Sequence, residues 1–543
     1  MPNVITHLQR LRRMPVSHTV AAALALLFGS STVLAQQTMP PATGATTRFP
    51  IKAFELTGDS PLSAEESARV LAPFVVPDGT LLTLQQATAA LEAELKAKGF
   101  ALVRVSLPPQ EVGATVRLQV VKFVMGKVSV EGLSRYNEAN IRASVPELRE
   151  GEAPNFKLLA IQTAIANESQ GKQVRVSLKE SEEANKIDAK LLVTESRPWN
   201  FSASLSNTGS ESTGRDRLTL LGSHANVFDL DHQFSAAYTT SLERIKDVKQ
   251  LGLNYRIPLY RQGSLLGLAY TRSDVLGDFG SFSSTGAGQT LSLNYSYYFE
   301  PEGGRRSYVM LGLDQKRFDA ALVNGVAVAG QQERGSRPVT VGYWVHTDSD
   351  AAVWGYNLEL AANAPGGSGN NLAAYQSEDV RTETQNWRAL RAGFNYAASF
   401  GTGWMWSVRA QLQYSAQALI SGEQFGLGGS ASVRGAGERA IAGDSGLLAT
   451  LELTGPEFKP GWRAVGFLDA GALRNNSSEL NPNKPASDHL LGLGFGLRYG
   501  AGAYRFTADW GRLLVGSVLP MTIGSTLPQS GDQKIHANLS IGF

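Results

Sequence analysis

From Trp199 to the C-terminus, apolar residues alternate with small or polar ones in segments of about ten residues. In the segment Leu251–Leu259 every odd position is apolar or aromatic, and residues 291–299 and 491–499 follow the same pattern. We count about sixteen such segments. They start near residues 199, 216, 232, 248, 264, 286, 306, 337, 354, 387, 404, 446, 462, 489, 504 and 534. At roughly 21 residues per strand and connection, the pattern predicts a transmembrane β-barrel of about sixteen antiparallel strands over residues 198–543.

The N-terminus indicates export from the cytoplasm. Three arginines, Arg10, Arg12 and Arg13, precede the apolar run 19–28, and small side chains at Val33 and Ala35 resemble a cleavage site. We therefore expect a signal peptide over residues 1–35 and a linker over 36–48. The alternative is a membrane-anchoring helix, but the apolar run is shorter than the roughly 20 residues needed to span a bilayer.

Composition excludes several classes of function. A net charge of +2 provides no field for nucleic-acid binding. The absence of cysteine excludes disulfides and thiolate chemistry. No Walker A motif or zinc-binding pattern occurs, so we expect no cofactor, no metal and no catalytic residues. The string Gly443–Gly446, "GDSG", matches a serine-protease motif. Since nothing points to a histidine and an acidic partner, we interpret it as the end of a loop.

Between the linker and the barrel the sequence predicts a duplicated module of strands and helices. Ser63 with Glu66, and Thr83 with Gln86, have the spacing of capping boxes that begin two helices. The string "VRVSL" occurs at 103–107 and again at 174–178, and "AFELTG" at 53–58 is matched by "KVSVEG" at 127–132. Two landmarks at one period favour duplication over chance similarity. The modules are expected over 49–124 and 125–197.

The motifs of the last third resemble one family. The glycine-rich loop at about 419–445 contains Val433, Arg434 and Gly435, and a later strand contains Phe467, Asp469 and Gly471. With the two modules and the barrel, these motifs resemble the two-partner secretion transporters, the hemolysin and filamentous-hemagglutinin secretion/activation proteins of the Omp85 superfamily. The resemblance implies two periplasmic POTRA domains, a barrel in the outer membrane of a Gram-negative bacterium, and no enzymatic activity.

The same resemblance implies a salt bridge between Arg434 and Asp469 inside the barrel. The alternation around Asp469 agrees, because a charge facing lipid costs up to about 2–4 kcal/mol and so the carboxylate is expected in the lumen. The alternative is that Arg434 makes no salt bridge and is merely a solvated side chain of a mobile loop. Two departures stand out: Ala436 occupies the position of an expected aromatic residue, and the proline-containing linker 36–48 is too short for a pore-plugging helix. The terminal Phe543 is expected to be a recognition signal for the barrel assembly machinery.

The implied function is ATP-independent export of one large secreted β-helical protein of hemolysin or adhesin type, embedded in outer-membrane lipid. The POTRA domains are expected to recognise this partner by strand addition. Candidate partner-binding residues lie on one strand and one helix of the second module: Val174, Val176, Leu178, Leu158 and Ile161. The alternatives are an Omp85-type insertase that assembles outer-membrane proteins, and a passive porin, which needs neither the modules nor the loop motif.

Overall fold

The computed structural model describes residues 47–543 except 112, 212, 276, 280–281, 285, 321, 324–325, 328 and 521–526. The predicted signal peptide, and all of the linker before Thr47, lie outside the described residues. The expectation that residues 36–48 contain no plug helix therefore stays a prediction. The chain divides into two compact units, residues 1–123 and 124–543, and each is described by itself.

The first unit contains one module built on a three-stranded sheet of order β1-β3-β2, with β1 parallel to β3. Its elements are β1 (Ala53–Thr57), α2 (Ala64–Leu71), η3 (Ala72–Phe74), α3 (Leu81–Ala97), β2 (Val103–Ser106) and β3 (Thr115–Lys122). Ser63 forms the predicted capping box with Glu66. The predicted cap at Thr83 is wrong: Thr80 caps α3 and Thr83 is its third residue, so the helix starts earlier.

The second module repeats this topology with a sheet of order β4-β6-β5, β4 being parallel to β6. It comprises β4 (Val124–Glu131), α4 (Glu138–Ser144), α5 (Phe156–Ala166), β5 (Lys172–Glu180) and β6 (Lys186–Glu195). Gly58 and Gly132 end the first strand of each module with φ of +88° and +90°. A Cβ at either glycine would meet a carbonyl oxygen of the neighbouring strand, Val120 or Val193. Equivalent glycines with the same constraint support the predicted duplication.

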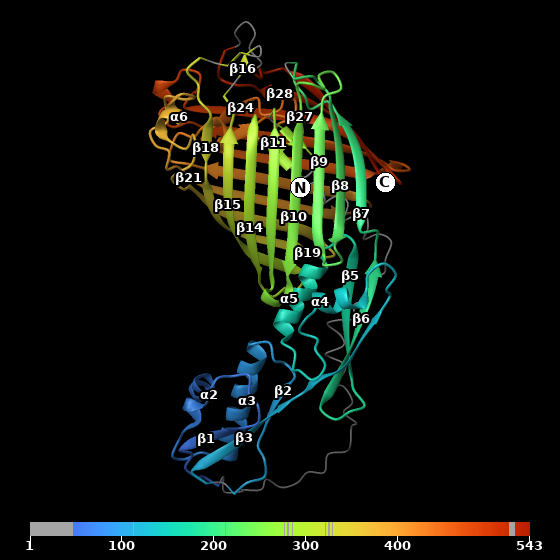
Figure 1. Cartoon of the computed structure of the whole chain (residues 1–543), viewed down its shortest axis with the longest axis vertical. Coiled ribbons are helices and arrows are strands. Elements are labelled where there is room, and N and C mark those ends of the chain that lie inside the picture. The colour runs from blue at the N-terminus through green and yellow to red at the C-terminus, as the bar shows by residue number, and fades with distance from the viewer. Residues whose placement is uncertain are drawn as a thin grey trace. The chain divides into compact units, whose positions relative to one another are not determined.

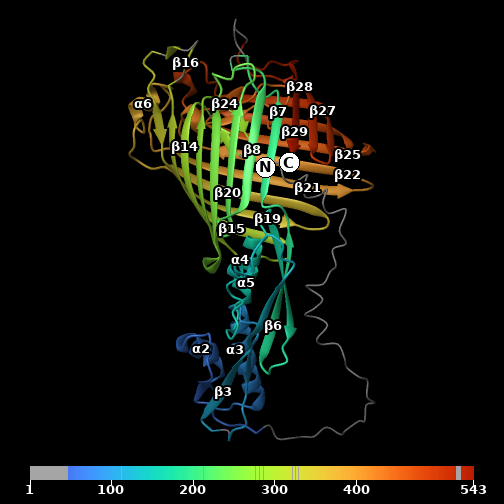
Figure 2. The same cartoon turned by 45° about the vertical axis from the view of Figure 1, so that its right-hand side comes forward.

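The remainder of the second unit is a closed antiparallel barrel of sixteen strands, and the predicted fold class is confirmed (Figures 1 and 2). The strands are β7 (Trp199–Ser206), β8 (Arg217–Val227), β9 (His232–Thr240), β10 (Gln250–Leu259), β11 (Ser264–Ser273), β14 (Gly288–Tyr298), β15 (Arg305–Phe318), β18 and β19 (Arg334–Ser336 and Pro338–Asp348, which together make one wall position), β20 (Ala352–Asn363), β21 (Arg388–Phe400), β22 (Trp404–Tyr414), β25 (Ser445–Lys459), β26 (Trp462–Arg474), β27 (Ser487–Ala501), β28 (Tyr504–Val515) and β29 (Gln533–Gly542). Pairing of β29 with β7, from Asn538–Ser206 to Gly542–Ser202, closes the wall.

Short elements lie in the connections. They are η4 (Tyr260–Gln262), β12 (Gly277–Phe279), β13 (Phe282–Ser284), β16 (Leu322–Val323), β17 (Val326–Ala327), α6 (Leu372–Gln376), η5 (Ser421–Glu423), β23 (Phe425–Leu427), β24 (Ile441–Gly443) and η6 (Ser478–Leu480). Among the described residues no helix is both long and apolar enough to cross a bilayer. The wall alternates instead: Val465, Phe467 and Asp469 on β26 are buried, whereas Leu468 between them is 40% exposed.

A buried ion pair joins the second module to the barrel. Lys172 Nζ on β5 lies 2.5 Å from Asp231 Oδ2 in the turn before β9, and the two side chains are 0% and 3% exposed. Asn140 of α4 accepts a hydrogen bond from Lys172 at 2.8 Å, and Tyr260 donates one to Asp231 at 2.8 Å. Burial lowers the pKa of Lys172, and the Asp231 carboxylate opposes that shift. The junction within this unit is therefore specific rather than a loose tether.

Candidate functional site

The loop between β22 and β25, called loop 6 here, folds into the barrel. Its stem is the hairpin of β23 and β24, with Phe425 opposite Gly443, and its tip is the connection between them. Gly435, next to Arg434 at the tip, has φ of +103°, and a Cβ there would lie 3.1 Å from the backbone nitrogen of Leu513 on β28. Glycine therefore allows the tip to lie directly against the barrel wall.

Arg434 and Asp469 form a two-pronged ion pair at this tip. Arg434 Nε lies 2.8 Å from Asp469 Oδ2, and Nη2 lies 2.8 Å from Oδ1. The Arg434 backbone nitrogen donates a third hydrogen bond, 3.1 Å long, to the same carboxylate. The side chains are 3% and 0% exposed. Paired donors of this kind fix the orientation of the arginine as well as its position.

Three further charged residues complete what we call the tip network. Arg434 Nη1 lies 2.5 Å from Glu452 Oε1 on β25 and 3.5 Å from Asp509 Oδ2 on β28. Arg498 on β27 pairs with the same Asp509, its Nη1 at 2.5 Å from Oδ1. Two guanidinium groups thus share three carboxylates, and four neighbouring strands, β25 to β28, supply the residues that surround the loop tip. These three residues alternate into the lumen but belong to no motif, so no local sequence pattern points to them.

The ring of Phe467 packs against the arginine. The guanidinium carbon of Arg434 lies 3.4 Å from the ring centre, within the range of a cation–π contact. Ala436, which replaces the aromatic residue expected in the loop, is 2% exposed and packs in an apolar cluster with Val433 and Leu513. An aromatic contact to the arginine is therefore present, and the barrel strand supplies it.

Gly471 of the strand motif makes room for the loop stem. A Cβ at this position would lie 2.6 Å from the Cδ atoms of Leu427 on β23. On β27, a Cβ at Gly492 would lie 2.5 Å from the carbonyl oxygen of Arg434. These two glycines make room for loop 6 inside the barrel, because a larger side chain at either position would displace the loop.

The stem of loop 6 has two anchors of its own. Asp444, within the "GDSG" string, pairs with Arg381 of the loop after β20, Nη1 to Oδ2 being 2.9 Å, and both side chains are 0% exposed. Its carboxylate also accepts hydrogen bonds from the backbone N–H of Leu419 and from that of Asn476, which lies in the loop after β26. The string does end the loop as predicted, but its aspartate joins three loops.

The second stem anchor is Glu423 of η5, whose side chain is 1% exposed. Its carboxylate lies 3.0 Å from Lys316 Nζ on β15 and 3.1 Å from Arg391 Nη2 on β21. Ser336 on β18 donates a further hydrogen bond of 2.7 Å to it. Loop 6 is therefore held at its tip and at two points of its stem by separate sets of residues.

The predicted partner-binding residues fall into two groups. On β5, an edge strand of its sheet, Val174 is fully buried, Val176 is half-buried and Leu178 is 39% exposed. The α5 residues of the prediction lie against the barrel. A Cβ at Gly263, in the turn before β11, would lie 3.0 Å from Ile161 and 3.4 Å from Leu158, and Ile161 packs with Leu265 and Tyr298 of the barrel. This face of α5 is covered because it docks on the barrel.

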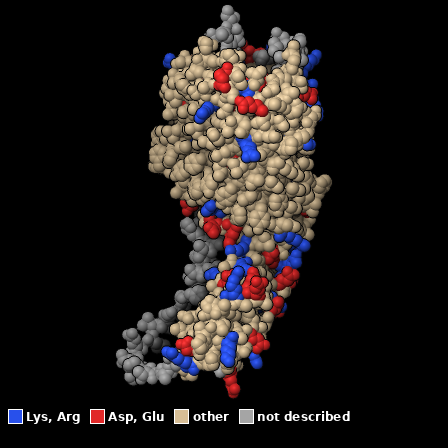
Figure 3. Space-filling model, turned by 90° about the vertical axis from the view of Figure 1, so that its left-hand side faces the viewer, with Lys and Arg blue, Asp and Glu red and all other residues tan. Residues whose placement is uncertain are grey.

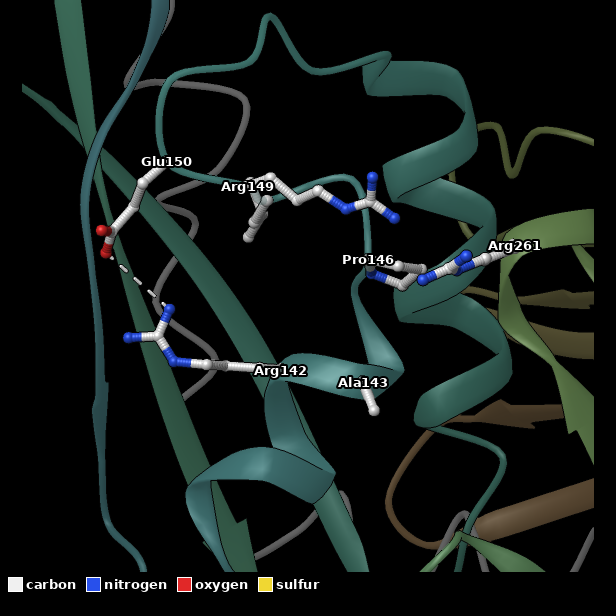
Figure 4. Close-up of a pocket in the computed structure, with 7 residues that line it drawn as sticks. Arg142, Ala143, Pro146, Arg149, Glu150 and Arg261 are labelled. Carbon is white, nitrogen blue, oxygen red and sulfur yellow. Dashed lines mark ion pairs between the residues drawn. The ribbon is translucent and has the colours of Figure 1, made fainter.

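A pocket remains open beside this contact. It has a volume of about 490 Å³ and is lined mainly by residues of the α4–α5 connection and by Arg261 of the barrel turn η4. Figure 4 shows Arg149 extending toward the side on which Arg261 lies, whereas Arg142 turns toward Glu150, with which it forms an ion pair of 3.9 Å. Three arginines against one glutamate give the lining a net positive charge.

Phe543 ends the chain at the seam of the barrel. Its backbone N–H donates a 2.8 Å hydrogen bond to Phe201 on β7, and its side chain is 67% exposed. The ring therefore projects from the outer wall. Such a position fits its proposed role as a signal for insertion, which stays a prediction.

The family model for haemolysin secretion/activation proteins ShlB/FhaC/HecB matches residues 185–499. The chain belongs to this family. A ShlB-type POTRA model matches residues 49–122. The first module is therefore a POTRA domain, and the predicted recognition is confirmed. Haemolysin secretion/activation proteins of this architecture lie in the outer membrane with their POTRA domains in the periplasm, so the chain is an outer-membrane export protein.

Known relatives agree with this assignment. The outer membrane transporter CdiB of Dickeya dadantii (strain 3937) is 23% identical over 397 residues, which are 70% of this chain and 68% of that protein. CdiB of Escherichia coli is 23% identical over 443 residues, 79% and 74% of the two chains. Among solved structures, CdiB from Escherichia coli aligns with a TM-score of 0.69 and 19% identity over 93% of both chains. CdiB from Acinetobacter baumannii aligns at 0.64 and 15%, over 99% and 98%. These two structures share the fold.

Proposed function

We propose that this family member exports one large, β-rich secreted protein of the hemolysin or filamentous-hemagglutinin type, without ATP. The observation that carries the proposal is the anchored loop 6, whose tip arginine is held by carboxylates on three barrel strands. A passive pore needs no such loop, whereas an exporter of a long polypeptide must keep its lumen closed to small solutes and open it for one cargo. Folding of the cargo outside the cell would supply the driving force.

In this proposal the periplasmic modules capture the cargo through the outer edge of β5. The Asn167 side chain accepts a 2.6 Å hydrogen bond from the Val174 backbone N–H and donates a 3.0 Å hydrogen bond to the Val174 carbonyl oxygen. It therefore pairs with both backbone groups at this edge, as a neighbouring strand would. Alternation of the backbone directs the corresponding groups of Val176 and Leu178 to the same edge. An extended segment of the cargo would pair with β5 from Val176 onward, with Leu178 as an apolar contact.

The tip network then sets the conducting state. Moving Arg434 out of the lumen separates it from Asp469, which is fully buried. Such a separation is costly unless another cation replaces the arginine. We infer that loop 6 yields only when cargo occupies the lumen, and that the empty barrel remains closed.

The alternative is an insertase that assembles other outer-membrane proteins. Two POTRA-like modules precede the barrel, a short array for such a role, and the strand motif Phe467–Gly471 is of the secretion type. Reconstitution distinguishes the two functions. Liposomes containing the purified chain receive, on the POTRA side and without ATP, either a large β-helical protein of the filamentous-hemagglutinin type or an unfolded barrel protein.

Export predicts that the β-helical protein becomes protected from protease inside a sealed vesicle, and that ATP does not change the yield. Deletion of residues 49–197 should abolish this transfer, while the remaining barrel, which keeps loop 6, should fold and stay closed in planar bilayers. Folding of the added barrel protein with no transfer of the β-helical protein would instead favour the insertase.

A further inference from the structure

The outward-facing charges at the extracellular end of the barrel are of one sign. In the described strand residues of that half of the wall, every charged side chain that alternates outward is an arginine, and none is a carboxylate. These residues are Arg272 (β11), Arg317 (β15), Arg388 (β21), Arg474 (β26) and Arg512 (β28). Figure 3 shows one face of the barrel, which is mostly uncharged and carries a few Lys or Arg and Asp or Glu residues in its upper part.

Their outward orientation follows from the strand alternation. Arg272 lies on the side of β11 that carries Leu268, which is 48% exposed, and Arg317 on the side of β15 that carries Leu313, which is 45% exposed. Arg388 shares its side of β21 with Phe394, which is 41% exposed. All three arginines are exposed in the structure. Each arginine therefore projects from the lipid-facing surface near the extracellular end of its strand.

Two of these arginines lie close together, and a third lies three strands further along the wall. Arg272 is opposite Gln289 on β14, and Gln289 is opposite Arg317 on β15, so the two arginines are two strands, about 10 Å, apart. Further along the wall, Arg388 is opposite Ala362 on β20. Between them Arg337, in the one-residue break between β18 and β19, is held by a 2.5 Å hydrogen bond from its Nε to Gln315. We call Arg272, Arg317, Arg337 and Arg388 the arginine band.

The band has no internal counter-charge. Within the described part of the chain, the guanidinium groups of Arg272, Arg317 and Arg388 make no hydrogen bond or ion pair, and the Arg388 interaction that exists involves only its backbone nitrogen. The next acidic residues along the chain, Asp274 and Asp319, belong to the loops that follow. Unpaired cations at the edge of a membrane are favourable where the lipid supplies the anion.

The opposite, periplasmic end of the wall is built differently. There aromatic rings contact one another in pairs, such as Phe400 stacked on Trp404 and Trp462 tilted against Tyr499. Aromatic residues are typical of the interface with an ordinary phospholipid leaflet. An arginine guanidinium, in contrast, can bind a phosphate group through two N–H donors at once. The two rims of the barrel therefore match two chemically different leaflets.

We propose that the arginine band binds the phosphate groups of the phosphorylated glycolipid that forms the outer leaflet of a Gram-negative outer membrane. This lipid lies against the extracellular rim and presents phosphates at the depth of the strand ends. Arginine suits this position, because its guanidinium fork matches phosphate in a way that a lysine does not. Bound lipid would fix the depth and rotation of this side of the wall independently of the cargo.

The test uses the full chain in detergent micelles, titrated with bisphosphorylated lipid A and followed by native mass spectrometry. The variant is Arg272→Gln/Arg317→Gln/Arg388→Gln, and we expect it to bind lipid A at least about tenfold more weakly because three charge-assisted contacts are lost. Arg305→Gln is the matched control, since Arg305 is an exposed arginine at the other end of β15. It should bind lipid A as the unaltered chain does.

Two further arms define the ligand. Dephosphorylated lipid A should bind the unaltered chain about tenfold more weakly, and inorganic phosphate alone should not compete, because the acyl chains hold the lipid at the wall. Heat-modifiable migration on gels shows that each variant is a folded barrel. The proposal is overturned by equal binding of phosphorylated and dephosphorylated lipid A, by a triple variant that binds as well as the control, or by full competition from inorganic phosphate.

Discussion

Arg434 and Asp469, 35 residues apart in the chain, meet inside the barrel through three hydrogen bonds of 2.8 to 3.1 Å. One residue comes from a loop and the other from the wall, so their contact exists only while the loop occupies the lumen. Two additional carboxylates, Glu452 and Asp509, lie within 3.5 Å of the same arginine. The position of the loop is thus linked directly to the charge balance of the lumen.

The first prediction concerns Arg434→Ala. Removing one member of a buried pair typically costs about 3–5 kcal/mol, because the partner charge is left without compensation. We expect the barrel to insert but partner secretion to fall, as measured by the amount of cargo in the medium. Arg215→Ala is the control, because its ion pair with Glu211 is exposed on another loop. Normal secretion by Arg434→Ala would contradict the role of the tip network.

The second prediction concerns Asp444→Asn, which weakens the stem and leaves the tip intact. Asp444 is fully buried and pairs with Arg381, so its neutralisation leaves that guanidinium, among the described residues, with only Asp379 as a carboxylate partner. We expect faster proteolytic cleavage in the loops after β20 and β26 as well as in loop 6. Asp274→Asn, at an exposed aspartate of another loop, should leave cleavage unchanged. An effect confined to loop 6 would show that Asp444 does not join the three loops.

The third prediction concerns the junction between the second module and the barrel. Lys172→Met leaves Asp231 buried without its cation, at a cost of about 3–5 kcal/mol. We expect hydrogen exchange to increase in the turn 228–231 and in α4. Lys190→Met is the control, since its ion pair with Glu131 on the same module is exposed and such pairs contribute about 0–1 kcal/mol. Adding Asp231→Leu to Lys172→Met should restore part of the protection. Similar exchange in both lysine variants would contradict a specific junction.

The fourth prediction is a pH dependence in the first POTRA domain. The Lys98 ammonium and the Ser63 backbone N–H lower the pKa of Glu66 from 4.5 to about 2. Because this pKa is lowered on folding, the stabilisation is complete above pH 4.5 and is lost as the pH falls toward 2. Amide protection of α2, corrected for intrinsic exchange rates, should therefore decrease over this range. Glu66→Gln should flatten that dependence and Glu65→Gln should not. Equal pH dependence in both variants would exclude Glu66 as its origin.

Much of the fold could be predicted because alternation is a local property. The predicted strand starts lie within three residues of the observed ones, as at 286 for Gly288 and 306 for Arg305. The cap of α3 cannot be placed from the sequence because both Thr80 and Thr83 lie at suitable positions, and only the extended backbone at Thr80 decides between them. The docked face of α5 could not be predicted, since an apolar helix face gives no sign of which neighbour will cover it.

The candidate site was partly predictable for a related reason. Arg434 and Asp469 can be predicted because each belongs to a motif. Glu452, Arg498 and Asp509, in contrast, are ordinary lumen-facing residues until the register of four strands brings them together. The role of Asp444 depends on Arg381, 63 residues earlier, and on Asn476, so no local pattern contains it.

The buried contact between Asp444 and Arg381 also concerns how the cell surface is recognised from outside. Loops after β20, β22 and β26 share this contact, so antibodies or bacteriophages that bind here meet one composite epitope instead of three separate loops. A substitution that lets one loop escape such recognition must also keep the shared carboxylate and guanidinium in place. Antigenic variation at this surface is therefore expected at the loop crests, with the Asp444–Arg381 pair held constant beneath them.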